Sequence, residues 1–510
     1  MRNVVLLAIN AKYVHSALAV WLLADSVICH TQTPHTVAVV EVTIHQNDSE
    51  IASLVAEHTP DVVGISTYIW NAAKLPGLME LLRARLPNTT FVLGGPEASN
   101  NADYWLAQGA HFVVQGEGEH QFPTLLDALA NEKPFSPHIE TTKSSNWTDP
   151  YHESYIRTLK GKLVYLETSR GCPYQCAFCL SGTNSDAGTN SNAGTNGNAG
   201  VRFLPLDMAK KQLHKLANSG VRTVKLVDRT FNCNPARAYA LFEYVINIDT
   251  HCCFHFEVAA DLFDAPTIAL LRTAPPGRIQ FEAGIQSYFP PTLVAISRKT
   301  DTDKADDNIR AILEEGNIHM HVDLIAGLPF ETLIQFKESF DRAYKLGAHD
   351  LQLGFLKLLH GSRLRKEAQA LGIRYHETPP YEIIESPWLS TDDINVLKQA
   401  ENALRHTYNK NRFMTTLNHV LSISKLRPYD LFHTLGSEAL NRSTPLEVYA
   451  QQLFNCFNKL PGVQETVLKS HMICDWLAMV RGKNMPAFLR ISEQNRKLLI
   501  TATEKNWAVL

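Results

Sequence analysis

Five short apolar runs mark the first 140 residues of the chain, and helical patterns separate them. The runs read VVLLAIN, HTVAVVEV, DVVGIS, TFVLGG and HFVVQG. Strands that helices bury on both faces are near-continuously apolar, whereas half-exposed strands alternate apolar and polar side chains. The pattern therefore predicts an α/β domain over residues 1–140, built as a doubly wound parallel sheet.

The same alternation returns over residues 155–372, with six further apolar runs. They read LVYLETS, VRTVKLVD, FHFEVAADL, RIQFEAGIQ, HMHVDLIAGLP and LQLGFLKLL. Between them, LDMAKKQLHKLANSG places Ala209, Leu213 and Leu216 on one helical face, with Gly220 as its stop. Six such units predict a partial (βα)6 barrel of the TIM type, whose catalytic loops would follow the carboxyl ends of its strands.

The strand pattern ends near residue 373. Residues 373–510 contain the amphipathic stretch LKQAENALRHTYNKNRF and further helical segments. We therefore expect a mostly α-helical C-terminal domain. Its aromatic side chains are expected in the core rather than along a pocket; they include Tyr381, Trp388, Tyr408 and Phe413.

Residues 182–199 form three near-identical hexads, GTNSDA, GTNSNA and GTNGNA, which contain no large apolar side chain. Such a segment cannot bury enough surface to offset the entropy of ordering it. It is therefore expected to be a mobile insertion inside the barrel domain.

The composition of the chain argues against several classes of protein. The 510 residues are 45% hydrophobic and 19% charged, with a formal net charge of -3. This balance gives no electrostatic reason to expect nucleic acid. No apolar run approaches the roughly 20 residues of a membrane-spanning helix, and VVLLAIN is too short for a secretory signal. We expect a cytoplasmic protein that binds neither nucleic acid nor a membrane.

Three cysteines carry the most specific chemistry. Cys172, Cys176 and Cys179 follow the CxxxCxxC spacing in ETSRGCPYQCAFCLSG. Three thiolates can hold three irons of a 4Fe-4S cluster and leave the fourth iron open, whereas electron-carrying clusters normally have four protein ligands. The spacing therefore predicts a cluster at which another molecule binds iron.

Two other interpretations of these cysteines remain. A structural zinc site usually pairs two CxxC hooks to give four ligands, and the six other cysteines of the chain form no second hook. The three thiols could also be core residues.

Polar residues recur on the predicted buried strands of the barrel. Unpaired buried carboxylates are costly, so these residues either form ion pairs inside the barrel or line a binding site. The set is Asp228, Glu257, Glu282, Gln286 and Asp323.

The cysteine loop, with Phe178 before its last cysteine, resembles that of the radical S-adenosylmethionine (SAM) superfamily. The resemblance implies that the methionine end of SAM binds the open iron and that reductive cleavage gives a 5′-deoxyadenosyl radical. FEAGIQS and DLIAGLPFET resemble the family's SAM-binding segments, and in the second Glu331 would brace the following helix. The implied SAM contacts are Phe178, Asp228, Glu257, Glu282, Gln286, Arg298 and Ile325.

The segments VVGISTYIW, FVLGGPEAS and FVVQGEGEHQFPTLL resemble the Rossmann-like cobalamin-binding domain of one large radical SAM class. The resemblance implies that cobalamin lies beyond the carboxyl ends of the strands. The implied contacts are Tyr13, His15, Ser66, Thr67, Gly94, Gly95, Gly116 and Glu117.

His15 departs from the family pattern. Cobalamin domains of the methionine synthase type carry DxHxxG, whose histidine coordinates cobalt, and in YVHSAL only His15 matches. The missing Asp removes the usual partner that orients a metal-bound imidazole. We therefore favour a solvent-facing or helix-capping His15 over a cobalt ligand. A domain that has kept this fold and lost cobalamin is a further alternative.

The resemblance implies a cobalamin-dependent radical SAM methyltransferase that acts on an unactivated carbon of a small-molecule or peptide substrate. A flavodoxin- or ferredoxin-type protein would donate the electron. Two alternatives stay open. One is a radical cyclase or rearrangement enzyme without methyl transfer, related to the anaerobic Mg-protoporphyrin monomethyl ester cyclases. The other is a non-catalytic sensor that holds the cluster and SAM. LLHGSRLRKEA and PPYEII resemble the C-terminal region of an uncharacterised subgroup of this class.

Overall fold

The structure is a computed structural model that describes residues 1–141, 147–182, 200–437, 445–480 and 485–490. The predicted insertion at 182–199 therefore lies, apart from Gly182, outside the described residues. The chain forms two compact units. The first comprises Met1–Glu282, Ile296–Ile318 and Lys357–Ile383, and the second comprises Ala283–Ala295, His319–Leu356 and Ile384–Leu510.

The predicted doubly wound sheet is present in the amino-terminal region. Its six strands run in the order β2-β1-β3-β4-β5-β6, and all neighbours are parallel. The strands are β1 (Arg2–Asn10), β2 (His35–Thr43), β3 (Val62–Ser66), β4 (Thr90–Gly94), β5 (Phe112–Gln115) and β6 (His138–Glu140). Each of the five predicted runs contains one strand. β6 has only three residues, too few for a recognisable pattern.

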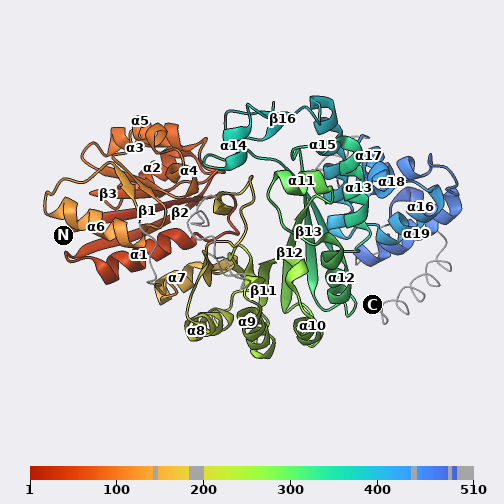
Figure 1. Cartoon of the computed structure of the whole chain (residues 1–510), viewed down its shortest axis with the longest axis horizontal. Helices are drawn as coiled ribbons and strands as arrows, with labels where there is room; N and C mark the ends of the chain where they lie inside the picture. Colours follow the sequence, from red (N-terminus) through yellow and green to blue (C-terminus); the bar gives the residue numbers. More distant parts are fainter. Residues whose placement is uncertain (142–146, 183–199, 438–444, 481–484, 491–510) are drawn as a thin grey trace. The chain divides into compact units, whose positions relative to one another are not determined.

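Helices cover both faces of this sheet (Figure 1). One face carries α1 (Leu18–His30) and α6 (Gly118–Ala130), and the other carries α2 (Asp48–Ala56), α3 (Leu75–Arg85), α4 (Pro96–Ser99) and α5 (Ala102–Ala107). Because side chains alternate along a strand, Val4 and Leu6 of β1 join the core under α1 and α6, while Val5 and Leu7 join the core on the other face. Burial on both faces explains why β1 is apolar throughout.

The second sheet is the predicted partial barrel. Its order, β14-β13-β12-β11-β10-β7, follows the chain strand by strand. The strands are β7 (Val164–Leu166), β10 (Thr223–Leu226), β11 (Cys253–Val258), β12 (Ile279–Gln286), β13 (His319–Ala326) and β14 (Asp350–Phe355). The helices between them are α8 (Leu206–Ala217), α9 (Pro235–Asn247), α10 (Ala265–Leu271), α11 (Pro290–Ala295), α12 (Thr302–Leu313) and α13 (Leu333–Tyr344). This arrangement confirms the six predicted strands, and α8 matches the predicted helix.

The C-terminal region is mostly helical, as predicted. Its helices are α15 (Thr391–His406), α16 (Met414–Ser424), α17 (Pro428–Ser437), α18 (Leu446–Phe457) and α19 (Glu465–Met479). The predicted amphipathic stretch does not form one helix: α15 ends at His406, and further along Asn411 and Phe413 adopt left-handed backbone angles, with φ of 49° and 56°. Three of the four predicted core aromatics are buried. The fourth, Trp388, is half-buried against Phe330.

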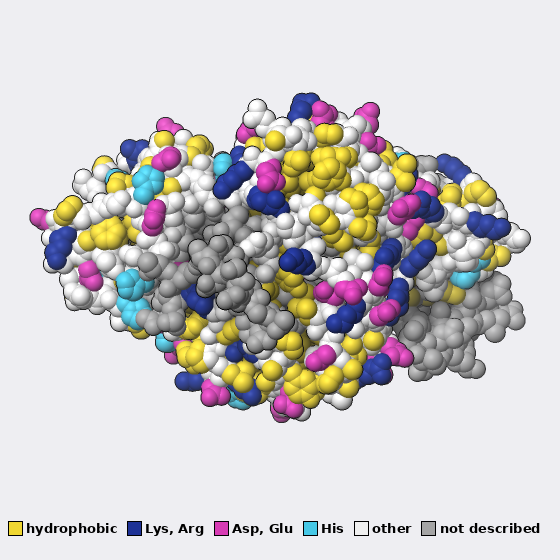
Figure 2. Space-filling view, in the orientation of Figure 1, with side chains coloured by type: hydrophobic (Ala, Val, Ile, Leu, Met, Phe, Trp, Pro, Cys, Tyr) yellow, Lys and Arg dark blue, Asp and Glu magenta, His cyan; other side chains and the backbone are white. Residues whose placement is uncertain are grey.

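Short elements complete the description: α7 (Glu153–Thr158), α14 (Arg363–Glu367), β8 (Ser169–Arg170), β9 (Arg202–Phe203), β15 (Arg374–Tyr375) and β16 (Ile383–Glu385). Among the residues described, no helix combines the length and the apolar character that crossing a membrane requires. On the face drawn in Figure 2, acidic and basic side chains are interspersed.

Glu331 braces the start of α13, as the sequence predicted. The side chain is buried, and Oε1 accepts hydrogen bonds from the hydroxyls of Ser287, at 2.6 Å, and Ser339 of α13, at 2.9 Å. Oε2 has no hydrogen-bond partner among the described residues. Burial raises the pKa of Glu331 from its ordinary value of 4.5 to about 7, so the folded protein favours the protonated carboxyl group.

The raised pKa of Glu331 predicts a pH-dependent stability. The folded protein keeps a proton that the unfolded chain releases above about pH 4.5, so this contribution is present at low pH and is lost as the pH rises through about 7. Glu331→Gln imitates the protonated form. The free energy of unfolding of this variant, relative to the parent, should therefore rise by about 1–3 kcal/mol between pH 5 and pH 8.

Chemical denaturation at the two pH values measures this difference. Glu338→Gln, which changes an exposed carboxylate on the same helix, is the matched control and should show no such rise. Equal pH dependence of the parent and Glu331→Gln would contradict the assignment.

Candidate functional site around the cysteine loop

The three predicted cluster ligands lie on one constrained loop after β7 and β8. Cys172 and Cys176 are buried, and Cys179 is half-buried. Gly171 enters the loop with φ of 96°, and a Cβ at this position would stand 2.3 Å from the carbonyl oxygen of Gly200. Further on, the Ala177 N–H donates to the carbonyl oxygen of Ile296 at 2.9 Å. Gly171 therefore permits a close backbone approach where the loop begins, and a backbone hydrogen bond holds the loop between Cys176 and Cys179.

The spacing of the three thiols disfavours the zinc interpretation. A tetrahedral zinc ion with Zn–S bonds of 2.3 Å needs sulfur atoms about 3.8 Å apart. Among the described residues, the one set of three potential ligands whose atoms all lie within 4.8 Å of one another does not include these cysteines. A 4Fe-4S cluster does not need its three thiolates this close together, because each thiolate binds a different iron.

Arg298 lies beside this loop rather than in open solvent. Its guanidinium is 3.8 Å from Sγ of Cys176 and lies over the ring of Tyr174 at 5.3 Å. Burial raises the pKa of the Cys176 thiol, and Arg298 opposes this effect. Because metal ligation requires the thiolate, Arg298 favours the form of Cys176 that binds iron. Contact of Arg298 with SAM stays a prediction.

Asp228 supports the chain that leads into the loop. It lies just beyond β10 and is 1% exposed. Its carboxylate accepts hydrogen bonds from the Thr168 N–H at 3.2 Å, the Thr168 hydroxyl at 3.0 Å and the Ser169 hydroxyl. Burial raises the pKa of Asp228 to about 6, although these bonds lower it. These three donors give Asp228 a bracing role, and its predicted SAM contact is untested.

Glu257 and Glu282 share the ammonium group of Lys225, at 3.5 Å and 3.0 Å. Burial raises the pKa of Glu257. In Glu282, the hydrogen bonds from His255, at 3.0 Å, and Lys225 outweigh burial and lower the pKa. The ion pairs that the sequence left as an alternative are therefore formed, and the predicted contacts of both residues with SAM are untested.

The remaining predicted SAM contacts differ in setting. Phe178 is half-buried on the cysteine loop. Gln286 ends β12 with φ of 72°. Ile325 lies in β13, two residues before Gly327, which has φ of 94°, a backbone angle that glycine adopts readily.

Two predicted cobalamin contacts meet where β3 and β4 end. Thr67, next to Ser66 at the end of β3, is fully buried, and its N–H donates to the carbonyl oxygen of Gly94 at 2.7 Å. Gly95 has φ of 97°, and a Cβ there would lie 2.7 Å from the carbonyl oxygen of Thr67. Oγ1 of Thr67 has no partner within the described part of the chain. The unpaired hydroxyl of Thr67 and the glycine backbone beside it would suit a ligand that lies along this edge of the first sheet.

The carboxylate of Glu117 forms ion pairs with two arginines. It pairs with Arg170, at 3.1 Å, and with Arg202. Arg170, only 11% exposed, also pairs with Glu119 and with Glu167, the latter at 2.8 Å. Arg170 immediately precedes the cysteine loop, so this network ties the rim of the first sheet to that loop. Gly116 opens the rim turn with φ of 103°.

The structure contradicts the helix-capping interpretation of His15. His15 is half-buried, and the N-cap position of α1 is Ala17 rather than His15. Nδ1 of His15 lies 2.6 Å from the hydroxyl of Tyr165 in β7. Burial lowers the pKa of His15, which favours the neutral imidazole. The hydroxyl of Tyr165 is thus a hydrogen-bond partner of the His15 ring, and ligation of cobalt by His15 stays a prediction. Tyr13 is 70% exposed.

Sequence reasoning missed Arg170 and Glu97. Glu97 follows the Gly94-Gly95 turn and is buried, which raises its pKa. It accepts a hydrogen bond from the hydroxyl of Tyr381 and lies 4.0 Å from His360. Apart from Glu167, the partners of Arg170 lie about 50 residues away along the chain, and Tyr381 lies 284 residues from Glu97, so the local sequence held little signal for these contacts.

Arg170→Gln should destabilise the protein by about 3–5 kcal/mol, because it leaves carboxylates buried without their cation. It should also lower the iron content after reconstitution, since the loop loses its anchor. Arg157→Gln, which removes an exposed ion pair with Glu153, should change neither quantity measurably. Denaturation and iron analysis of both variants check this. An Arg170→Gln protein of parental stability would disprove the anchoring role.

Comparisons with known families agree with this order of parts. Residues 4–126 match the model of the B12 binding domain. Residues 166–343 match the radical SAM superfamily. Residues 369–509 match a family described as a protein of unknown function, DUF4080.

One curated relative is the cobalamin-dependent radical SAM methyltransferase TokK of Streptomyces tokunonensis. It is 24% identical over 66% of this chain and 52% of that protein. The chain thus spans about half the length of the first curated relatives that it matches.

Two solved structures share the fold. OxsB, a cobalamin-dependent SAM radical enzyme solved with aqua-cobalamin and SAM, has a TM-score of 0.62 at 14% identity, over 100% of this chain and 84% of that chain. The methyltransferase TsrM from Kitasatospora setae, solved with cobalamin and a 4Fe-4S cluster, has a TM-score of 0.58 at 14% identity, over 99% of this chain and 100% of that chain. The chain therefore carries, in this order, a B12 binding domain, a radical SAM domain and a C-terminal DUF4080 domain.

Proposed function

We propose that this protein is a cobalamin-dependent radical SAM methyltransferase acting on an unactivated carbon. The observation that carries the proposal is the ion-pair network of Arg170, which joins the rim of the B12 binding domain to the cysteine loop. A methyl donor and a radical source serve one reaction only if the protein holds both in fixed positions. The name of TokK, a cobalamin-dependent radical SAM methyltransferase, and that of TsrM, a radical SAM methyltransferase solved with cobalamin and a 4Fe-4S cluster, support the proposal.

Each part of the chain has a role in this proposal. Cys172, Cys176 and Cys179 would bind the 4Fe-4S cluster, with Arg298 favouring the thiolate of Cys176. Thr67 and Gly95 would border the cobalamin tail. When bound, the reduced cluster supplies the electron that cleaves SAM, and methylcobalamin supplies the methyl group.

The remaining assignments follow from the same proposal. The substrate would be a small molecule or a peptide, and a flavodoxin- or ferredoxin-type protein would donate the electron. The proposed location is the cytoplasm, where thiols stay reduced. We propose neither nucleic acid nor a membrane as a partner.

Cys176→Ala should lose both the reconstituted cluster and SAM cleavage, because two thiolates leave two irons without protein ligands. The matched control is Cys253→Ala, which removes a half-buried thiol of β11 and should keep both. The measurement is anaerobic reconstitution with iron, sulfide and hydroxocobalamin, followed by mass spectrometry of the products formed from SAM and a reductant. SAM cleavage by Cys176→Ala at the parental rate would overturn the cluster assignment.

The same experiment separates the alternatives. 5′-Deoxyadenosine together with retained cobalamin supports the two-cofactor enzyme, and transfer of a labelled methyl group to substrate would distinguish methylation from cyclisation. 5′-Deoxyadenosine without retained cobalamin would reduce the first domain to a scaffold. Absence of both would favour the sensor.

A further inference from the structure

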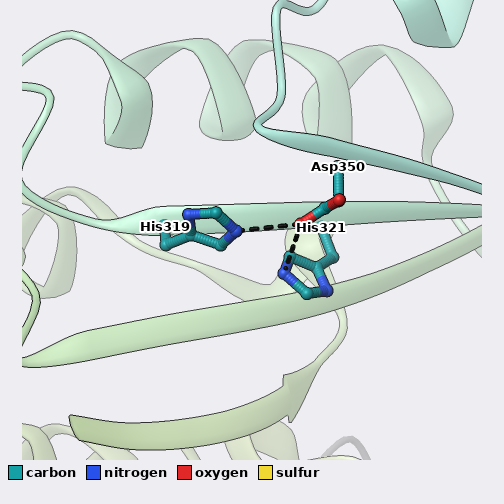
Figure 3. A group of neighbouring side chains, drawn as sticks. All are labelled: His319, His321 and Asp350. Carbon is teal, nitrogen blue, oxygen red and sulfur yellow. Dashed lines mark hydrogen bonds and ion pairs between the residues drawn. The ribbon is translucent and has the colours of Figure 1, made fainter. Parts of the chain in front are cut away.

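Three potential metal ligands converge where β13 and β14 begin. Oδ2 of Asp350 lies 3.0 Å from Nε2 of His319 and 2.9 Å from Nε2 of His321. Ligand atoms of all three residues lie within 4.8 Å of one another. Figure 3 shows the two imidazole rings directed at the same carboxylate. The group stands at the opposite end of β13 from the Gly327 turn, and neither the proposed activity nor the family matches assign it a role.

Strand geometry produces this convergence. His319 and His321 are two residues apart, so their side chains leave β13 on the same face, while Met320 and Val322 are buried on the other face. The parallel register places Asp350 of β14 beside His321. The side chains of His321 and Asp350 are 15% and 21% exposed, whereas that of His319 is 43% exposed, so the group is partly shielded from water and an ion can reach it.

Neighbouring groups suit a metal-bound His321. Nδ1 of His321 lies 3.1 Å from the side-chain amide of Gln352. The oxygen and nitrogen of such an amide can exchange places by rotation. With the oxygen facing His321, the amide accepts Nδ1–H and leaves the lone pair of Nε2 for an ion, which is the usual arrangement around ligating histidines.

His349 is excluded as a fourth ligand. Its ring lies 4.5 Å from that of His319, but its Nδ1 accepts the backbone N–H of Met320 at 3.2 Å. The neutral ring therefore carries its proton on Nε2, which has no lone pair left for an ion. A water molecule would complete a four-coordinate set.

We propose that His319, His321 and Asp350 form a binding site for a divalent first-row transition metal ion of the zinc class. Imidazole ligands favour zinc, copper, iron or nickel over magnesium or calcium. Zinc bonds of about 2.0–2.1 Å to each ligand place tetrahedral ligand atoms about 3.3 Å apart. The two separations between Asp350 and the histidines, 2.9 and 3.0 Å, need only a few tenths of an ångström of expansion, and the ligand atoms of the two histidines lie within 4.8 Å of each other.

The ion would join β13 to β14 at the place where the C-terminal domain holds β14. The side-chain amide of Asn409 pairs with the N–H and the carbonyl group of Leu351, at 3.0 Å and 2.8 Å. The hydroxyl of Tyr408 donates to the carbonyl oxygen of Ala348. Both residues lie in the short helix η4 (Tyr408–Lys410). The site is therefore structural and does not depend on the proposed activity.

Zinc content after dialysis of the reconstituted full-length protein tests the proposal. Elemental analysis should find one zinc per chain in the parent, counted separately from cluster iron. A background with Cys172, Cys176 and Cys179 changed to Ala should keep this zinc, because the thiols are then removed as competing ligands. Asp350→Asn and His319→Gln should each lower the affinity for zinc at least tenfold. Gln352→Ala, which changes an exposed side chain, should weaken it by about tenfold.

His138→Ala is the matched control. His138 forms a two-member pair with Asp103 at 3.2 Å, and its loss should leave the zinc content unchanged. Added zinc should raise the Tm of the parent and of His138→Ala but not that of Asp350→Asn. Asp350→Asn keeps the shape of the side chain and an acceptor oxygen, and His319→Gln gives a second variant should the first not fold. The proposal would be overturned if the parent held no zinc, or if Asp350→Asn and His319→Gln both retained it. The three residues would then be a hydrogen-bonded group without a metal.

Discussion

Arg170 holds a nearly buried guanidinium against carboxylates from two parts of the first unit. A buried charge is tolerated only when opposite charges and hydrogen bonds replace water, so the rim turn and the cysteine loop must keep their relative positions for this network to exist. The guanidinium cannot deprotonate to escape the cost. The position of the loop relative to the B12 binding domain is therefore set by electrostatics, in addition to the packing of apolar side chains.

The charges of this network balance only if one acid is protonated. Two arginines, Arg170 and Arg202, face three carboxylates, those of Glu117, Glu119 and Glu167. The arginines outweigh burial and lower the pKa of Glu117, whereas burial raises that of Glu167 to about 7. Glu167 is thus the group that takes the proton, and the network is neutral when it does. Asp228, just beyond the neighbouring strand β10, shows the same effect of burial.

The features that could be predicted from the sequence depend on residues close together along the chain. Strands such as β1 were recognisable because both faces are buried, and the cysteine loop because its spacing is local. Side-chain partners were not predictable, because the fold brings them together from distant positions: His15 and Tyr165 are 150 residues apart, and Glu97 and Tyr381 are 284 apart. The helix-capping interpretation of His15 failed for this reason, since its hydrogen-bond partner Tyr165 lies in the other domain.

The C-terminal domain covers backbone groups of β14, the edge strand of the partial barrel. An open sheet leaves the backbone groups of its last strand, β14, available for pairing with other chains. The side chain of Asn409 imitates a neighbouring strand, since it both donates to and accepts from Leu351. That contact requires the chain to leave α15 at His406 and to form η4, and Asn411 ends η4 in a left-handed conformation. The amphipathic pattern of the sequence continues through this break, because the reason for the break lies on β14 and not in the helix itself.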